Sequence, residues 1–284
     1  MSRPLVASID PAALSHNLGL ARRLAGTARV LAVVKANGYG HGLSRVARAL
    51  RNADGFAVLT LEEAGLLRSE GYSHPIVLLE GFFHADELPE IVRRRLLPVI
   101  HRVDQADTLI RSRLEHRLDI LVKVDSGMHR LGLAPARLKE VVFKLRASGN
   151  VGNITLMTHF ARADEPDAGI AGQLSVFRQA IAGLDLPVTL ANSAALFDYP
   201  DSHGDWVRPG LMLYGASPFA ERSATELGLL PGMALQSRLI AVQTVRKGEG
   251  VGYGARFVAP RDMRVGVVAC GYADGYPRHA ETGV

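Results

Sequence analysis

The sequence predicts a (β/α)8 barrel followed by a mainly β domain. Eight short apolar segments alternate with helical patterns up to about residue 225. Such an alternation implies a parallel sheet that helices bury on both faces, and eight such units suggest a closed barrel. A doubly wound open sheet is the alternative, but no GxGxxG motif follows the first strand.

The predicted elements follow in a regular order. Asp10 serves as N-cap and Pro11 as first residue of an opening helix that Gly26 ends. The expected strands are Arg29–Lys35, Gly55–Leu59, Pro75–Leu79, Leu97–Ile100, Leu118–Asp125, Asn153–His159, Val188–Ala191 and Trp206–Leu213. Helical patterns between them are LSRVARALR, LEEAGLLRSEG, ADELPEIVRRR, VDQADTLIRSRLEH, APARLKEVVFKLRASG, DAGIAGQLSVFRQAIAG and, shorter, NSAALFD.

The pattern changes after about Thr225. Alternating residues and turn signals replace the helical periodicity, which indicates the start of a β domain. We therefore expect a barrel at residues 10–225 and a β domain at residues 226–284 together with residues 1–9. The sequence stops at RHAETGV without an obvious closing strand, so we expect this β domain to be truncated or to depend on a partner.

Composition excludes several classes of protein. The chain has 284 residues, is 48% hydrophobic and carries a net charge of +5, which is typical of an ordinary globular protein. The only basic run, Arg93–Arg95, is on a predicted helix, so we expect no nucleic-acid partner. No apolar window reaches ~18 residues and no secretory signal begins the chain, so we expect no membrane span. With a single cysteine, Cys270, the expected compartment is the cytoplasm.

Lysine is rare in this chain. Of 33 basic residues only five are lysines, and two of them, Lys35 and Lys123, end apolar strand-like runs. The other three, Lys139, Lys144 and Lys247, fall on predicted surface elements. Because arginine serves wherever a general cation is needed, a lysine at a strand end suggests amine chemistry, which arginine cannot perform.

Polar residues gather at the carboxyl ends of the predicted strands, where barrel active sites lie. Any one of them could be a polar residue of the core whose hydrogen bonds are satisfied there, but their joint placement favours an active site. They are Lys35, Lys123, Asp125, His159, Asn192, Ser193 and Arg208. The histidines His41, His101 and His203 show no spacing of metal ligands, and we expect no metal.

A lysine in a largely desolvated pocket can act as a nucleophilic amine. Its most familiar use is a Schiff base with a carbonyl substrate or with pyridoxal 5′-phosphate (PLP). PLP also needs a phosphate site, which barrels often build after strands seven and eight. Asn192, Ser193 and the backbone around Gly210 would lie there. Ser193 opens a short predicted helix, so it could also be an ordinary N-cap.

Motifs along most of the chain resemble those of the alanine racemases. AVVKANGYGHG, Ala32–Gly42, resembles that family's PLP-lysine signature, and the later motifs are KVDSGMHRLG, THFARADE, ANSAA, VRPGLMLYG, GYGA and GYADGYPR. The resemblance implies a PLP-binding barrel followed by a β domain. It also implies a homodimer with shared active sites that interconverts L- and D-alanine, for peptidoglycan synthesis or alanine catabolism.

The resemblance also implies a role for each matching residue. Lys35 would bind PLP covalently and act as the base on one face of the substrate. Tyr253, from the other subunit, would be the second base. Arg130 would orient the substrate carboxylate, and Tyr272 would line the site. The other cofactor-binding residues would be Tyr39, His159, Asn192, Ser193, Arg208, Gly210 and Leu211.

The implied chemistry is physically consistent. Two bases on opposite faces of the substrate can remove the α-proton from one face and return it on the other. A phenol is a poor base at neutral pH unless cations stabilise its phenolate, which a Tyr253–His159–Arg208 network would do. Arg208 would face the pyridine nitrogen of PLP. A cation there disfavours protonation of the ring and should suppress transamination.

Lys123 raises its own question. A protonated amine beside Arg130 in a barrel mouth would place two like charges in a dry environment. In the family this lysine is often carbamylated, which would give Arg130 an anionic partner. The alternative is that Lys123 simply pairs with Asp125.

The sequence departs from the family pattern at its end. The family continues with further β strands that contact substrate and phosphate, and this chain stops at Val284. A PLP-binding barrel with little or no turnover is therefore an alternative, as is a racemase of another small amino acid. A PLP decarboxylase is disfavoured, because such enzymes offer an acid where this chain has Arg208.

Overall fold

The computed structural model describes residues 3–278 and divides into two compact units. One unit is Asp10–Gly232, and the other joins the N-terminal segment ending at Ile9 to the chain that starts at Met233.

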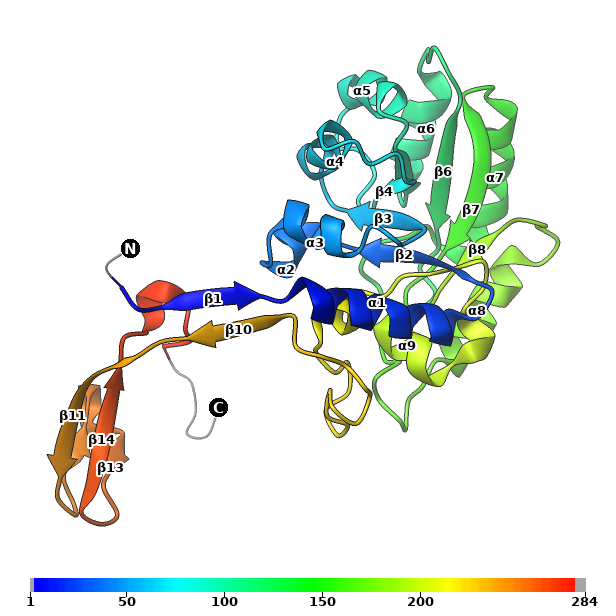
Figure 1. Cartoon of the computed structure of the whole chain (residues 1–284). Coiled ribbons are helices and arrows are strands. Elements are labelled where there is room, and N and C mark those ends of the chain that lie inside the picture. The colour runs from blue at the N-terminus through cyan, green and yellow to red at the C-terminus, as the bar shows by residue number, and fades with distance from the viewer. Residues whose placement is uncertain (1–2, 279–284) are drawn as a thin grey trace. The chain divides into compact units, whose positions relative to one another are not determined.

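The larger unit is a closed barrel of eight parallel strands in sequential order, as predicted (Figure 1). The last strand closes on the first through the pairs Arg29↔Trp206 and Val30↔Val207. The strands are β2 (Arg29–Val33), β3 (Gly55–Val58), β4 (Ile76–Leu78), β5 (Leu97–Ile100), β6 (Leu118–Lys123), β7 (Val151–Met157), β8 (Val188–Thr189) and β9 (Trp206–Val207).

Helices cover the outside of this barrel (Figure 1). The exception is α2, a five-residue segment with left-handed φ/ψ whose two end residues line a pocket. The first helix begins as predicted, since the Asp10 carboxylate accepts hydrogen bonds from the N–H groups of Ala12 and Ala13, and Gly26 follows its end. The helices are α1 (Pro11–Ala25), α2 (Lys35–Tyr39), α3 (Leu43–Ala49), α4 (Leu61–Ser69), α5 (Leu88–Arg93), α6 (Val103–Arg111), α7 (Leu138–Ala147), α8 (Ala171–Ile181) and α9 (Ser193–Asp198).

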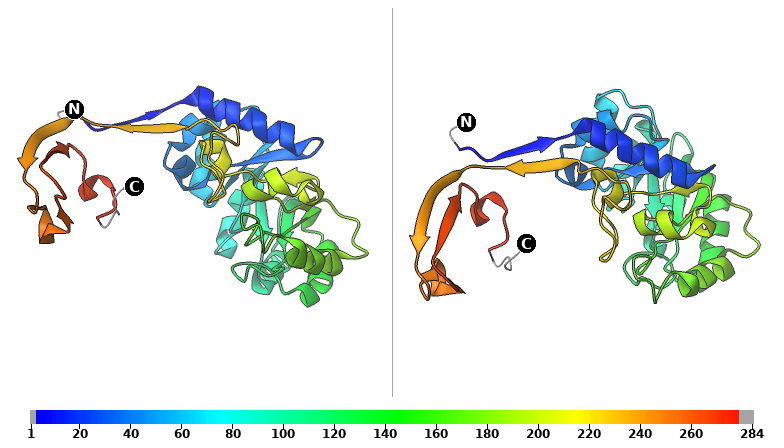
Figure 2. Two further views of the ribbon diagram at one scale, coloured as in Figure 1. Left: turned by 90° about the horizontal axis from the view of Figure 1, so that it is seen from below. Right: turned by 60° about the horizontal axis from the view of Figure 1, so that its bottom comes forward.

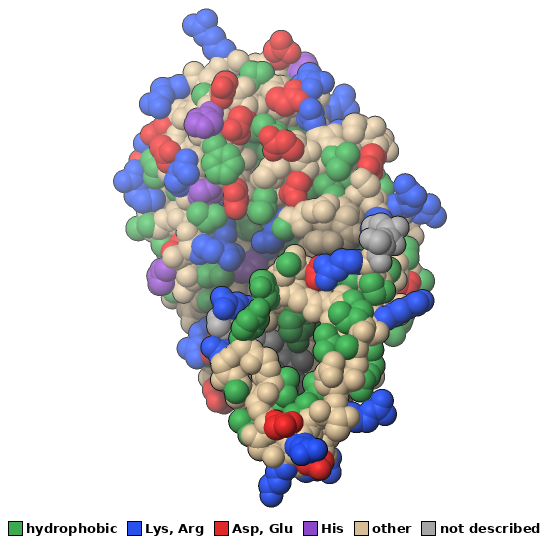
Figure 3. Space-filling model, turned by 90° about the vertical axis from the view of Figure 1, so that its left-hand side faces the viewer, with side chains coloured by type: hydrophobic (Ala, Val, Ile, Leu, Met, Phe, Trp, Pro, Cys, Tyr) green, Lys and Arg blue, Asp and Glu red, His purple; other side chains and the backbone are tan. Residues whose placement is uncertain are grey.

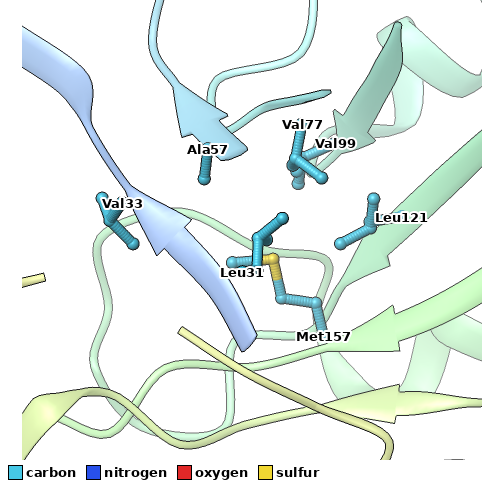
Figure 4. Packing of buried hydrophobic residues seen from close by; sticks show 7 residues of the cluster. All are labelled: Leu31, Val33, Ala57, Val77, Val99, Leu121 and Met157. Carbon is cyan, nitrogen blue, oxygen red and sulfur yellow. The ribbon is translucent and has the colours of Figure 1, made fainter. Parts of the chain in front are cut away.

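Side chains from successive strands fill the barrel interior (Figure 4). The middle of the interior is filled by apolar, buried residues and is a packed core, whereas polar strand residues such as Lys123 lie at the rims. The cluster consists of Leu31, Val33, Ala57, Val77, Val99, Leu121 and Met157.

Every predicted strand except Leu97–Ile100 ends earlier in the structure than the sequence pattern suggests. The first stops at Val33, before Lys35, and the eighth stops at Val207, although it was expected to reach Leu213. Pro209 cannot donate a backbone hydrogen bond to a neighbouring strand. The chain therefore leaves the sheet and forms a short 3₁₀ helix, η4 (Leu211–Tyr214).

The smaller unit consists of three antiparallel strand pairs. β1 (Val6–Ile9) pairs with β10 (Met233–Gln236), and the further views in Figure 2 show these two strands side by side. The other pairs are β11 (Leu239–Val245) with β14 (Met263–Val268) and β12 (Gly250–Val251) with β13 (Phe257–Val258).

The strands of the smaller unit expose several large apolar side chains. Leu239 is 60% exposed and Ile240 is 65% exposed, and the space-filling view in Figure 3 shows hydrophobic side chains, in green, at the surface. Within residues 3–278, no helix combines the length and the apolar character that crossing a membrane requires.

Candidate active site

A pocket of about 580 Å³ lies where the barrel strands end at their carboxyl termini. Its lining comes from residues at or after the ends of β2, β3, β4, β6, β7, β8 and β9. Of the site residues that the sequence places in the barrel, Asp125 does not line the pocket. The lining includes Lys35, Tyr39, Lys123, Arg130, His159, Asn192, Ser193, Arg208, Gly210 and Leu211.

The chain turns sharply just after Lys35. Ala36, Asn37 and Gly38 have φ/ψ near 52/53, 55/44 and 63/47, and Tyr39 has φ 52. These four residues form a turn of left-handed helix, which costs about 1–2 kcal/mol for each residue other than glycine. The sequence predicted a glycine-containing loop here but not a left-handed run. Non-glycine residues held at positive φ are frequent at functional sites.

Gly38 is required in this turn for two reasons. Its φ is +63, and a Cβ atom at this position would lie 2.7 Å from Cγ2 of Val46 in α3. A side chain here would therefore be strained and would also collide with the core. The glycine allows the turn to pack directly on α3.

Tyr39 packs against a second tyrosine, Tyr214, which is not among the predicted site residues. Its ring stacks on Tyr214 with centroids 4.5 Å apart, and the Tyr214 hydroxyl donates to the Val33 carbonyl at 3.0 Å. Burial raises the pKa of Tyr39, so its hydroxyl remains protonated and can donate a hydrogen bond. The signal for Tyr214 was its place in the PGLMLYG motif, next to the residues assigned to phosphate.

The loops after β8 and β9 meet at Ser193. The Ser193 hydroxyl accepts hydrogen bonds from the N–H groups of Gly210 at 3.0 Å and Met212 at 3.4 Å. The N-cap of α9 is Asn192, whose side chain accepts from Ala195 N–H, so the alternative role of Ser193 as an N-cap is wrong. The serine instead joins two loops at the edge of the pocket.

Arg208 is a buried cation held by neutral acceptors. It is 3% exposed, and its guanidinium donates to Thr189 Oγ1 at 2.7 Å and to the carbonyls of Thr158 at 2.7 Å and Leu190 at 3.1 Å. No ion pair among the described residues involves it. Burial lowers the pKa of Arg208 to about 9, so it remains charged at neutral pH. A buried charge without a counterion is costly, which favours a functional role.

His159 lies next to this guanidinium. Arg208 Nη2 is 3.3 Å from His159 Nδ1, and because arginine can only donate, Nδ1 is the acceptor and Nε2 carries the proton. Burial, with the charges of Arg208 and Lys123, holds the pKa of His159 well below its usual value. The imidazole is therefore neutral, and one link of the predicted Tyr253–His159–Arg208 network is present.

Lys123 is the last residue of β6 and is 5% exposed. Burial, together with the charges of Arg208 and Arg130, lowers the pKa of Lys123 to about 8. The described residues contain no ion pair between Lys123 and Asp125. The Asp125 carboxylate instead accepts from the N–H groups of Gly127 and His129 and from the His129 ring.

These contacts shape the loop that carries Arg130. Burial alone would raise the pKa of Asp125, but the hydrogen bonds from His129 and Gly127 outweigh it and lower that pKa. The Leu133 N–H donates to the Lys123 carbonyl and the Asp125 N–H to the Leu133 carbonyl. The loop is thus tied down at both ends, with Arg130 at the pocket.

Two carboxylates also line the pocket, Glu80 and Asp164. Glu80 was not predicted, although it directly follows the predicted strand Pro75–Leu79, which is the placement that identified the other candidates. Asp164 lies in the THFARADE motif.

The two predicted tyrosines of the smaller unit do not line the pocket. Tyr253 begins the 3₁₀ helix η5 (Tyr253–Ala255) and is 92% exposed, and Tyr272 begins η6 (Tyr272–Asp274) and is 66% exposed. The pocket therefore brings together the candidates of the barrel except Asp125, and Tyr253 and Tyr272 belong to the other unit.

Comparison with known proteins identifies the family on both units. The family model described as "Alanine racemase, N-terminal domain" matches residues 9–218, and "Alanine racemase, C-terminal domain" matches residues 232–284. Together they span most of the sequence.

Individual relatives agree with this result. The alanine racemase of Nitrosospira multiformis is 53% identical, with 100% of this chain and 80% of the relative covered. That of Thiobacillus denitrificans is 58% identical over 99% of this chain and 76% of the relative. The crystal structure of the biosynthetic alanine racemase from Pseudomonas aeruginosa superposes with a TM-score of 0.95 at 47% identity, covering 99% of this chain and 79% of that one. The chain therefore belongs to the alanine racemase family.

Proposed function

We propose that this protein interconverts L- and D-alanine with PLP as its cofactor. The family is PLP-dependent. The observation that carries the proposal is the barrel-mouth pocket in which Lys35 stands with a buried guanidinium, Arg208, that has no carboxylate partner among the described residues. This combination supports an amine-bound cofactor whose ring nitrogen meets a cation.

The residues of the pocket fit PLP. Four cations face two carboxylates in the lining, which favours an anionic ligand such as a phosphate. An ideal Cβ on Gly210 would lie 2.6 Å from the Tyr39 hydroxyl, so only a glycine lets the hydroxyl and the loop meet. We assign the phosphate to Tyr39, Ser193 and the backbone of Gly210 and Leu211, with Asn192 beside them.

PLP, when bound through Lys35, supplies an electron-withdrawing ring that makes the α-proton of an amino acid removable. Once the amine of the substrate has displaced Lys35 from PLP, the freed Lys35 amine would remove or return that proton on one face of the substrate, and Tyr253 of a second subunit would do so on the other face. The charged Arg208 would disfavour protonation of the ring nitrogen. Neutral His159 links Arg208 to the Tyr253 hydroxyl.

We propose that Arg130 binds the substrate carboxylate and that Lys123 is carbamylated. A pKa of about 8 leaves a usable fraction of neutral amine at physiological pH. Its Nζ can attack the carbon of CO2 and lose a proton, which gives an N-carboxylate of charge −1. That group would give Arg130 an anionic partner in a pocket that several other cations line.

We further propose a homodimer in which each pocket is completed by Tyr253 and Tyr272 of the other subunit. The high exposure of Tyr253 leaves it free to enter a second copy. In this proposal residues 10–225 form the cofactor-binding barrel, and residues 226–284 with residues 1–9 form the β domain that joins subunits.

The reaction would supply D-alanine for peptidoglycan or lead alanine into catabolism. Relatives carry both kinds of name, since the Klebsiella aerogenes relative is called catabolic and the Pseudomonas aeruginosa structure biosynthetic. With one cysteine in the chain, Cys270, we place the reaction in the cytoplasm.

The proposal is tested by exchange of the α-proton in D2O. We expect NMR to show loss of the α-proton of both D- and L-alanine, and chiral chromatography to show the opposite enantiomer forming. Lys35→Ala should abolish both and bind PLP without a covalent bond. Tyr253→Phe should block proton removal from one enantiomer, whereas Tyr276→Phe, in the same unit, should leave both rates near those of the unchanged chain.

Mixing the two inactive variants tests the shared site. Lys35→Ala and Tyr253→Phe subunits together should recover part of the activity, because one pocket of a mixed dimer holds both bases. Failure to recover activity would contradict sharing.

Two other outcomes of the exchange experiment would favour the alternative functions. If the chain binds PLP at Lys35 but exchanges no α-proton, it is a PLP-binding protein without turnover. Proton exchange with another small amino acid but not alanine would identify a different racemase.

A further inference from the structure

We propose that Glu63 is a positioning residue for Lys35, because its carboxylate holds the left-handed turn that follows the lysine. This inference rests on the proposed function, in which Lys35 binds PLP. Glu63 does not itself line the pocket. It lies in the first turn of α4, whose N-cap is Thr60.

The two carboxylate oxygens of Glu63 bind two different segments. Oε1 accepts from the N–H of Asn37 at 2.9 Å, and Oε2 accepts from the N–H of Leu59 at 3.0 Å. Asn37 is in the middle of the left-handed turn, and Leu59 follows β3 and lines the pocket. The carboxylate therefore connects the turn after β2 to the end of the next strand.

The position of Glu63 is itself fixed by hydrogen bonding. Its N–H donates to Thr60 Oγ1 at 3.2 Å, so the residue is anchored at the start of a helix. On the other side, the Asn37 side chain accepts from the N–H of Leu43 at 2.9 Å. The turn is thus held at Asn37 from two sides, once by the backbone and once by the side chain.

The turn needs such a constraint because its conformation is unfavourable. Ala36, Asn37 and Tyr39 are non-glycine residues at positive φ, and without external contacts each would relax toward negative φ. Relaxation would move Lys35 at one end of the turn and Tyr39 at the other. Both residues line the pocket, so the Glu63 contact fixes the positions of two groups that would face the cofactor.

The test is Glu63→Gln. An amide keeps one acceptor oxygen but presents an NH2 group, so one of the two backbone N–H groups faces a donor. We expect the purified apo chain to capture added PLP at Lys35 about tenfold more slowly or worse, measured by absorbance and by borohydride trapping followed by peptide mapping. We also expect hydrogen exchange to rise about tenfold in residues 36–42 and to stay unchanged in β6 and β7.

Glu62→Gln is the matched control. Glu62 is exposed in the same helical turn, so it removes the same charge without touching the turn after Lys35. Its capture rate should equal that of the unchanged chain. If Glu63→Gln is recovered unfolded, Glu63→Asp tests the same claim, because it keeps the charge but is too short to reach both N–H groups.

A rescue separates positioning from general stability. Glycine adopts positive φ freely, so Ala36→Gly in the Glu63→Gln background should restore part of the capture rate. A purely structural loss would not be rescued there. The inference is overturned if Glu63→Gln captures PLP at the normal rate, or if exchange rises across the whole barrel without rescue. If the unchanged chain captures no PLP at Lys35, the proposed function fails, and this inference with it.

Discussion

The close approach of Gly210 to Tyr39 gives a sharp test of the phosphate site. An ideal Cβ on Gly210 would lie 2.6 Å from the Tyr39 hydroxyl oxygen and 3.4 Å from Cζ. Gly210→Ala must therefore displace a hydroxyl whose ring is stacked on Tyr214. Forced displacement of a packed side chain costs roughly 1–3 kcal/mol, or about 5- to 150-fold in affinity for a ligand that uses the hydroxyl.

Tyr39→Phe removes the oxygen that the new methyl group meets. Alone, it should weaken phosphate binding by about 10- to 100-fold, the usual loss for a hydrogen bond to a charged group. Combined with Gly210→Ala, the nearest remaining contact is Cζ at 3.4 Å, which is ordinary van der Waals distance. The double variant should therefore bind no more weakly than Tyr39→Phe alone.

The assay is fluorescence titration with pyridoxamine 5′-phosphate, which keeps the phosphate but cannot bond covalently to Lys35. Urea unfolding of each apo variant supplies the stability reference, and Gly172→Ala is the control because its ideal Cβ has no atom within 4 Å. Additive losses in the double variant would refute the reasoning, since they would show that the methyl group acts on something other than Tyr39.

Two further predictions concern the buried cations. For Lys123, ¹³C NMR under ¹³CO2 should show a carbamate signal that grows as pH rises through about 8 and is absent from Lys123→Met; a bare amine at every pH would contradict carbamylation. Without CO2, the pKa of Lys123 in the folded chain lies below its ordinary value of 10.5, so the unfolded chain binds more protons between pH 8 and 10.5. The free energy of unfolding should therefore rise over this range by at most about 3 kcal/mol. The urea midpoint of Lys123→Met should lack this rise. For Arg208, an ammonium cannot reach all the acceptors, so Arg208→Lys should lower the free energy of unfolding by roughly 1–3 kcal/mol per acceptor left unpaired; unchanged urea midpoints would argue against those contacts.

Most of the barrel could be predicted because its signals are local. The run ending in Val33 and the run ending in Lys123 are apolar segments of strand length, and their burial on both faces is visible in the sequence. Once the strand order is known, the rule that sites lie at carboxyl strand ends places the polar residues together. Glu80 shows a limit of this rule. It directly follows a predicted strand and lines the pocket, but it is not among the predicted site residues.

The strand at the end of the barrel shows why other features could not be predicted. Trp206–Leu213 has a strand-like composition, yet only Trp206–Val207 pair with neighbours. Whether a segment stays in a sheet depends on the backbone partners available at that point, and Pro209 removes one of them. The apolar residues that follow, Leu211–Tyr214, instead pack as a 3₁₀ turn under Tyr39.

The order of strands and helices, the family and the set of groups at the pocket all follow from local sequence patterns and motifs. How those groups are held depends on contacts between segments that lie far apart in the chain. The neutral acceptors around Arg208 come from the ends of two other strands, and the left-handed turn after Lys35 is bound by Glu63, 26 residues further along the chain from Asn37. Periodicity reports the burial of each segment, whereas these contacts join segments that are distant in sequence. They can form only when the closed barrel brings its strand ends to one rim.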